Sequence, residues 1–130
     1  FIFMKPYRGR TRRPLLTPGR YIAEVASIGL KRIGSSGELV LNKKQIPYIS
    51  IMFKTEEGKI AADFLSSDSW IWTLFYAAFG VEYIKDHPID TSFFLNKKVG
   101  ITVENNYEIV HGVNKFKGVV VTSEFHKVIV

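Results

Sequence analysis

The side chains that most often carry out catalysis are sparse and scattered in this sequence. Its three histidines, His87, His111 and His126, are far apart along the chain, and there is no cysteine. The sequence contains no glycine-rich phosphate loop, no His-Glu-x-x-His zinc motif and no Gly-x-Ser-x-Gly nucleophile motif. The acidic residues form no spaced pair, and the neighbours Glu56 and Glu57 are typical of a solvated hairpin tip. We therefore expect a protein without enzymatic activity, cofactor or metal.

Aromatic and basic residues, by contrast, are combined in a pattern that suits nucleic acid. Single strands are bound by a positively charged groove, which contacts phosphates, and by aromatic rings, on which bases stack. The alternation within residues 48–54 places Tyr48 and Lys54 on one face of a strand, opposite a core face of Ile49, Ile51 and Phe53. Tyr48 is therefore the first candidate for stacking, and core packing is its alternative. Tyr21 and Tyr107 are the other candidate rings.

The basic candidates come from an N-terminal segment, a long first loop and the strands. For each of them a solvated surface position is the alternative reading. The predicted phosphate contacts are Arg8, Arg10, Arg12, Arg13, Arg20, Lys31, Arg32, Lys43, Lys44, Lys54, Lys59 and Lys115.

The net charge is concentrated at the start of the chain. The 130 residues carry 18 Lys and Arg against 12 Asp and Glu, and residues 1–20 hold six of the basic residues and no acid. Residues 21–130 are therefore neutral overall. Because blocks of like charge stay extended and often contact nucleic acid, we expect residues 1–19 to form a flexible basic arm. A solubilising tail is the alternative, and residues 20–130 are expected to fold as one domain.

The elements that must position these side chains are mostly short strands. Hydrophobic alternation predicts strands over residues 20–28, 48–54, 59–65, 98–104 and 116–123, and the connection between the last two is expected to hold a short ribbon at 107–110. Residues 29–46 form a long basic loop, and its Gly34-Ser35-Ser36-Gly37 tip is expected to be flexible. Gly29 and Gly100 are interpreted as bends in strands.

One segment has helical instead of alternating periodicity. Residues 70–79 are predicted to form a helix, with N-cap oxygens from residues 66–68 and a C-terminal stop at Gly80. The helix is too apolar to cover only one end of a small barrel. Either residues 81–97 cover its second face, or another subunit does. The core face is expected to consist of Ile71, Leu74, Phe75 and Ala78, and the predicted homodimer interface of Trp70, Trp72, Tyr76 and Phe79.

The order of these elements predicts the fold class. Three strands, a helix and two strands, with a long loop after the first strand, match an OB-fold-like five-stranded Greek-key barrel whose helix lies between strands 3 and 4. This is an all-β fold with one helix. An SH3-like barrel and an open α+β sheet are alternatives with a similar element order.

Several short motifs resemble one phage-associated family of OB-like proteins. They are the Pro18-Gly19-x-Tyr21 strand opening, residues 48–53, the aromatic helix ending at Phe79-Gly80, residues 95–103 and residues 114–119. This resemblance implies single-stranded DNA binding without catalysis, in phage replication or recombination, in the cytoplasm of an infected host cell. One departure is the end His126 to Val130, where such proteins often have an acidic tail. Either that tail is missing from this sequence or partners are recruited otherwise.

We therefore expect a single-stranded DNA-binding protein with little sequence preference, with RNA as a further candidate ligand. Replication or recombination proteins are candidate partners. The rival expectation is a phage structural or assembly protein that uses its apolar helix as an interface. No membrane association is expected, because the longest apolar stretch has about 12 residues and a spanning helix needs about 20.

Overall fold

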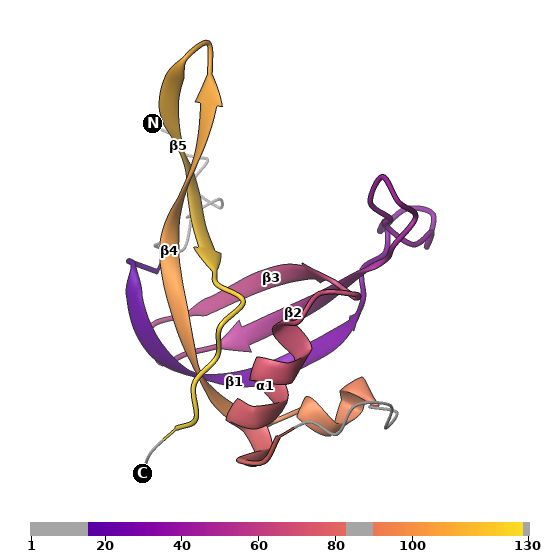
Figure 1. Cartoon of the computed structure of the whole chain (residues 1–130), viewed down its shortest axis with the longest axis vertical. Coiled ribbons are helices and arrows are strands. Elements are labelled where there is room, and N and C mark those ends of the chain that lie inside the picture. The colour runs from indigo at the N-terminus through magenta and orange to yellow at the C-terminus, as the bar shows by residue number, and fades with distance from the viewer. Residues whose placement is uncertain (1–15, 83–89, 129–130) are drawn as a thin grey trace, which may run out of the picture.

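The computed structural model describes residues 16–82 and 90–128, and these residues form a mostly β fold with one α-helix. Five antiparallel strands make one open sheet in the order β3-β2-β1-β4-β5 (Figure 1). Along the chain, α1 and the short 3-10 helix η2 lie between β3 and β4. The elements are β1 (Gly19–Leu30), β2 (Tyr48–Lys54), β3 (Lys59–Leu65), α1 (Trp70–Phe79), η2 (Thr91–Phe94), β4 (Lys98–Val110) and β5 (Val113–Val121).

The bounds predicted for β2, β3 and α1 are confirmed. β2 and β3 pair along their whole length, from Tyr48 opposite Leu65 to Lys54 opposite Lys59. The turn between them is held by Thr55, whose buried hydroxyl donates to the Gly58 carbonyl at 2.8 Å. This hairpin therefore has the short loop that its sequence indicates.

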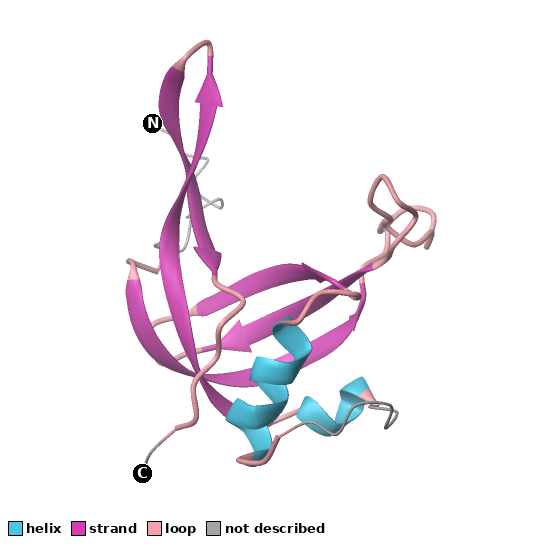
Figure 2. Cartoon of the chain, in the orientation of Figure 1, coloured by secondary structure: helices cyan, strands magenta, loops and turns pink. Residues whose placement is uncertain are grey.

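The core lies on the concave side of the sheet, where α1 and the C-terminal segment cover it (Figure 2). The inward side chains of the central strands, such as Val25, Ile51 and Ile101, are fully buried. Phe125, beyond the last strand, packs its ring 5.7 Å from that of Phe53. The alternation of apolar residues along each strand thus supplies one continuous buried layer.

The N-cap and the buried face of the helix both differ from the prediction. Its N-cap is Ser69, whose side chain makes no capping hydrogen bond, so residues 66–68 do not cap it. Its buried residues are Trp70, Leu74 and Ala77, whereas the rest of the expected core face is half-buried. The stop at Gly80 is confirmed, because this residue has a left-handed φ of 74° and donates its N–H to the Tyr76 carbonyl at 2.8 Å.

The prediction for the last two strands was wrong about their length. β4 continues without a break through Asn105-Asn106 to Val110, and β5 starts at Val113 instead of residue 116. The two strands are joined by His111-Gly112, and both residues have positive φ (53° and 77°). Because two-residue hairpin turns of type I′ need positive φ at both positions, this dipeptide closes a long hairpin. The strands project from the sheet as a ribbon (Figure 1).

Gly100 is needed for close approach of two chain segments. It exchanges backbone hydrogen bonds with His126, at 2.6 and 2.9 Å. A Cβ at this position would lie 3.1 Å from both the Cβ and the carbonyl oxygen of His126. The absence of a side chain therefore lets the C-terminal segment pair with β4. No such contact exists at Gly29, where a Cβ would meet nothing within 4 Å.

Candidate nucleic-acid interface

The outer face of β2 presents the side chains that its alternation predicts. Ile49, Ile51 and Phe53 are buried, whereas Tyr48, Ser50 and Met52 are half-buried and Lys54 is exposed. The neighbouring β3 adds Lys59, Ala61 and Asp63 to the same face through direct pairing. The middle of this face is thus lined by small or flexible side chains, with an aromatic ring at one end and amines at the other.

A hollow of about 590 Å³ lies at the Tyr48 end. Tyr48 lines it together with the exposed Lys43 and Lys44, which come from the end of the long loop. Asn42 shapes this loop end, because its Oδ1 accepts the backbone N–H groups of Lys44 and Ile46, each at 2.9 Å. Local sequence therefore fixes the backbone of the loop end from which Lys43 and Lys44 reach the same hollow as Tyr48. Asp68 is the acidic residue in this lining.

A row of charged residues crosses four strands at the other end of the face. Lys59 pairs with Lys54, Lys54 with Glu24, and Glu24 with Lys98. Three of these side chains are exposed amines, and the half-buried carboxylate of Glu24 lies between two of them. Opposite charges at directly paired positions favour the pairing of β1 with β2 and β4 here, whereas Lys54 and Lys59 are like charges opposite each other. The row lies six residues from Tyr48, or about 20 Å along β2.

The row borders a second hollow, of about 630 Å³. Arg20 and Lys54 line it with Lys98, which the sequence analysis did not include among the site residues. Glu24, Glu56 and Glu57 line it too, so three acidic residues balance three basic ones. This end of the face is therefore less positive than the Tyr48 end. Lys98 could be found only from the strand register, because no local pattern relates it to Lys54.

Two predicted phosphate contacts have partners within the protein. The Lys31 ammonium forms an ion pair with the Asp63 carboxylate. Arg32 donates from Nη1 to the Gly37 carbonyl at 2.9 Å, across the tip of the long loop. Both side chains therefore stabilise the loop.

The three candidate tyrosines do not lie together. Tyr21 is half-buried against the core, and its hydroxyl donates to the Thr17 carbonyl at 2.6 Å. Tyr107 lies on the ribbon, and its ring is 5.9 Å from that of Phe116, a residue that the sequence analysis missed. Tyr48 is consequently the candidate ring that shares a hollow with basic side chains of the long loop.

Of the remaining basic candidates, Lys115 is not part of this face. Lys115 lies on β5 in the ribbon, opposite Glu108. Figure 1 shows the ribbon and the long loop on different sides of the sheet. Arg8, Arg10, Arg12 and Arg13 lie outside the described residues.

The predicted helix interface is wrong at Trp70. This side chain is only 1% exposed, its Nε1 donates to the Leu65 carbonyl at 2.6 Å, and its ring stacks on Phe64 with centroids 5.2 Å apart. The burial follows from its place at the first turn, directly above the end of β3. Trp70 is a core residue.

The other three residues of this predicted interface differ in how exposed they are. Phe79 is half-buried, with Phe94 of η2 5.7 Å away, so part of the segment 81–97 does cover it. Trp72 and Tyr76 are 50% and 48% exposed. They line a hollow of about 410 Å³ with Glu82 and Phe125.

The described residues contain no group of three or more His, Cys, Asp or Glu side chains arranged to bind a metal ion. Asp90 caps η2 by accepting the Ser92 N–H at 2.9 Å, and this hydrogen bond holds the pKa of its carboxyl below the ordinary value. In the same part of the chain, no helix is long and apolar enough to cross a membrane. No protein-family model matches the sequence, and no curated protein matches it either.

Proposed function

We propose that the protein binds single-stranded nucleic acid on the outer face of the β2–β3 hairpin, without catalysing a reaction. The observation that carries this proposal is the hollow that Tyr48 lines together with Lys43 and Lys44. A ring beside two amines offers a base a stacking surface and its phosphates two counter-charges. The middle of the face carries no aromatic ring, and its acidic residue Asp63 is neutralised by its ion pair with Lys31.

The strand order supports an OB-fold-like barrel as the scaffold. In that fold β1 pairs with both β2 and β4, which is the pairing found here, and the barrel is partly open. β3 and β5 lie at opposite ends of the strand order and are also in contact, as a barrel requires. OB-folds bind oligonucleotides on the face of strands 2 and 3 and on adjacent loops. Tyr48, Lys54 and the long loop occupy these positions.

Single-stranded DNA is the proposed ligand, and phage replication or recombination the proposed context. Both come from the resemblance of the short sequence motifs. Little sequence preference is expected, because every base offers a π-face to an aromatic ring. The place of action would be the cytoplasm of the infected cell.

Fluorescence anisotropy with labelled oligonucleotides tests the proposal. Single-stranded DNA, duplex DNA of the same sequence and single-stranded RNA are titrated with the full chain at several salt concentrations. We expect the tightest binding to single-stranded DNA and weaker binding as salt rises. Equal binding to duplex and single strand, or no binding at low salt, would contradict it.

A second candidate function is protein binding through α1, in a phage structural or assembly role. The exposed Tyr76 ring beside the hollow that Phe125 lines favours this alternative. Tyr76→Lys should then abolish capture of the protein partner and leave oligonucleotide binding unchanged. If Tyr76→Lys leaves capture of the protein partner intact, this second candidate function is contradicted.

A further inference from the structure

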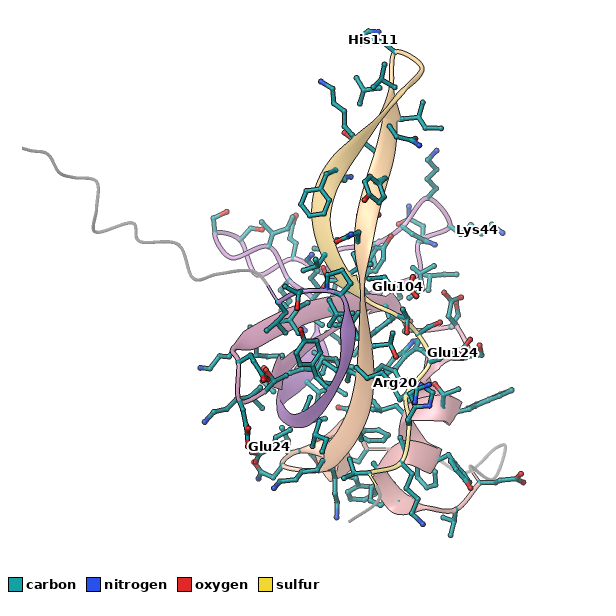
Figure 3. The ribbon with its side chains drawn as sticks, turned by 90° about the vertical axis from the view of Figure 1, so that its left-hand side faces the viewer. Arg20, Glu24, Lys44, Glu104, His111 and Glu124 are labelled. Atoms are coloured by element: carbon teal, nitrogen blue, oxygen red, sulfur yellow. The ribbon has the colours of Figure 1, made fainter. Side chains whose placement is uncertain are left out.

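Within the described part of the chain, the ribbon formed by β4 and β5 has no strand along one edge of β4. The last pair between β1 and β4 joins Gly19 to Val103, whereas β4 and β5 remain paired to Val110. Figure 3 shows Glu104 at the base of the ribbon and His111 at its tip. Over residues 104–110, β4 therefore has β5 on one edge and, among the described residues, no strand on the other.

The backbone groups at this open edge belong to alternate residues. The Thr122 N–H donates to the Thr102 carbonyl at 2.9 Å, so the even-numbered residues of β4 point their backbone groups toward the β5 side. Asn105, Tyr107 and Ile109 consequently direct their N–H and C=O groups to the open edge. Among the described residues, no strand pairs with β4 on this edge to satisfy these groups.

The same residues carry an exposed apolar surface. The side chain of Ile109 is 75% exposed, and those of Tyr107 and its cross-strand partner Phe116 are 55% exposed each. On the opposite face, Glu108 forms an ion pair with Lys117 at 3.2 Å. A two-stranded ribbon is only marginally stable in water unless another element covers it. As far as the described residues show, the ribbon thus has both an open backbone edge and an uncovered apolar face.

The charge of the ribbon indicates a protein and not a nucleic acid as the occupant. Residues 104–121 contain two glutamates and two lysines, so they have no net charge. A polyanion would need an excess of positive charge here. An extended strand of a protein, by contrast, needs free N–H and C=O groups and an apolar neighbour.

We propose that the occupant is a second copy of this chain, paired antiparallel through β4. With a two-fold axis at Tyr107, each Asn105 would pair with Ile109 of the second copy, so the unsatisfied backbone groups would satisfy one another. The two ribbons would form a four-stranded sheet in the order β5-β4-β4-β5. The Tyr107 and Phe116 rings of both copies would make one continuous apolar cluster.

The charges select β4 over β5 for this pairing. Natural proteins protect open edges with lysines, and β5 carries Lys115 and Lys117. A two-fold axis at Phe116 would place these lysines opposite each other in the two copies. In the proposed β4 pairing, Glu104 would face Val110 and Glu108 would face Asn106, so no like charges are directly opposed.

Sedimentation equilibrium of the full chain over a concentration series tests this proposal. We expect a monomer–dimer equilibrium that Ile109→Lys weakens at least tenfold, because it puts two ammonium groups into the shared apolar cluster. The control Ile22→Lys makes the same change at another exposed strand position, 60% exposed on β1, and should leave the dimer intact. A wild-type monomer at all concentrations, or a dimer that Ile109→Lys does not weaken, would overturn the proposal.

A cysteine pair tests the register and does not depend on a destabilising substitution. The chain has no cysteine, so Asn105→Cys and Ile109→Cys each introduce a single thiol. An oxidised mixture of the two variants should give a disulfide-linked dimer, because residues paired directly across strands lie close enough for a disulfide. Each variant alone should form much less disulfide-linked dimer. In the proposed pairing its thiol would lie four residues along the strand from the thiol of the second copy. Equal linking in all three samples would overturn the proposed pairing.

Discussion

The Tyr48 side chain is the residue on which the proposed function depends most directly. Tyr48→Ala should weaken binding of single-stranded DNA by about 1–3 kcal/mol, or roughly 5- to 150-fold, because it removes one stacking surface. The melting temperature should change little, since the ring is only half-buried. Anisotropy and thermal unfolding measure the two effects.

Tyr76→Ala is the matched control for Tyr48→Ala. It removes an exposed tyrosine ring from the helix and should leave DNA affinity unchanged. If both substitutions reduce affinity equally, or if Tyr48→Ala mainly lowers the melting temperature, the ring of Tyr48 does not stack a base.

Gly100 allows a prediction about stability at a single residue. Gly100→Ala should destabilise the fold by about 1–3 kcal/mol, because its Cβ would press against the backbone of His126. Gly29→Ala adds the same methyl group to β1, where no atom lies within 4 Å, and should be nearly neutral. Urea unfolding of both variants compares them. Equal stabilities would mean that the C-terminal segment moves aside at little cost.

The positions of single residues could be predicted where they depend on local alternation. The outward direction of Tyr48 follows from its apolar neighbours in β2. The ion pair of Lys31 with Asp63 could not be predicted, because it joins residues 32 positions apart and depends on how β1, β2 and β3 pair. The position of Lys98 opposite Glu24 could not be predicted either, because it depends on how β1 and β4 pair.

At the scale of elements, Trp70 determines how α1 is attached to the sheet. Trp70→Ala should lower the free energy of unfolding by about 3–5 kcal/mol, because it leaves a large cavity next to Phe64 and removes the hydrogen bond to Leu65. Denaturant unfolding of this variant, with Tyr76→Ala as the exposed control on the same helix, measures the difference. If Trp70→Ala leaves the free energy of unfolding unchanged and alters the oligomeric state instead, Trp70 lies in a subunit interface.

The elements themselves could be predicted to different degrees. The bounds of α1 follow from a continuous apolar segment and from Gly80, which adopts the left-handed conformation that ends helices. The ribbon could not be predicted from the same rules. Asn105-Asn106 is typical of a loop, yet both residues pair with β5, at Val119 and Gly118, and extend β4. Cross-strand pairing outweighs the weak strand propensity of asparagine there.

At the scale of the whole molecule, the charge is divided between a basic N-terminal segment and a neutral remainder. The affinity of a protein for a single strand falls with salt by a slope of about 0.7 in log units for each phosphate neutralised. Replacing both Lys43 and Lys44 by alanine should therefore reduce this slope by about 1.4. Replacing Lys115 and Lys117, which lie in the ribbon, should leave it unchanged. Equal effects of the two double substitutions would place the bound strand elsewhere.

The N-terminal segment should contribute more to this slope than the sheet face does. Residues 1–13 contain five basic residues and no acid, so deletion of these residues removes most of the net charge of +6. If three of these charges contact phosphates, the slope should become shallower by roughly 2. The melting temperature should not change, because the sequence of this segment has no apolar periodicity with which it could join the core.

The deletion also separates the two sources of affinity. Phosphate contacts release counterions and are strongest at low salt, whereas stacking on Tyr48 depends little on salt. The truncated chain should therefore lose most affinity at low salt and approach the full chain at high salt. Tyr48→Ala should reduce affinity by a similar factor at both salt concentrations. A truncated chain with an unchanged slope would mean that the N-terminal segment does not contact phosphates. Binding would then depend on Lys43 and Lys44 beside Tyr48, in a remainder of the chain whose net charge is close to zero.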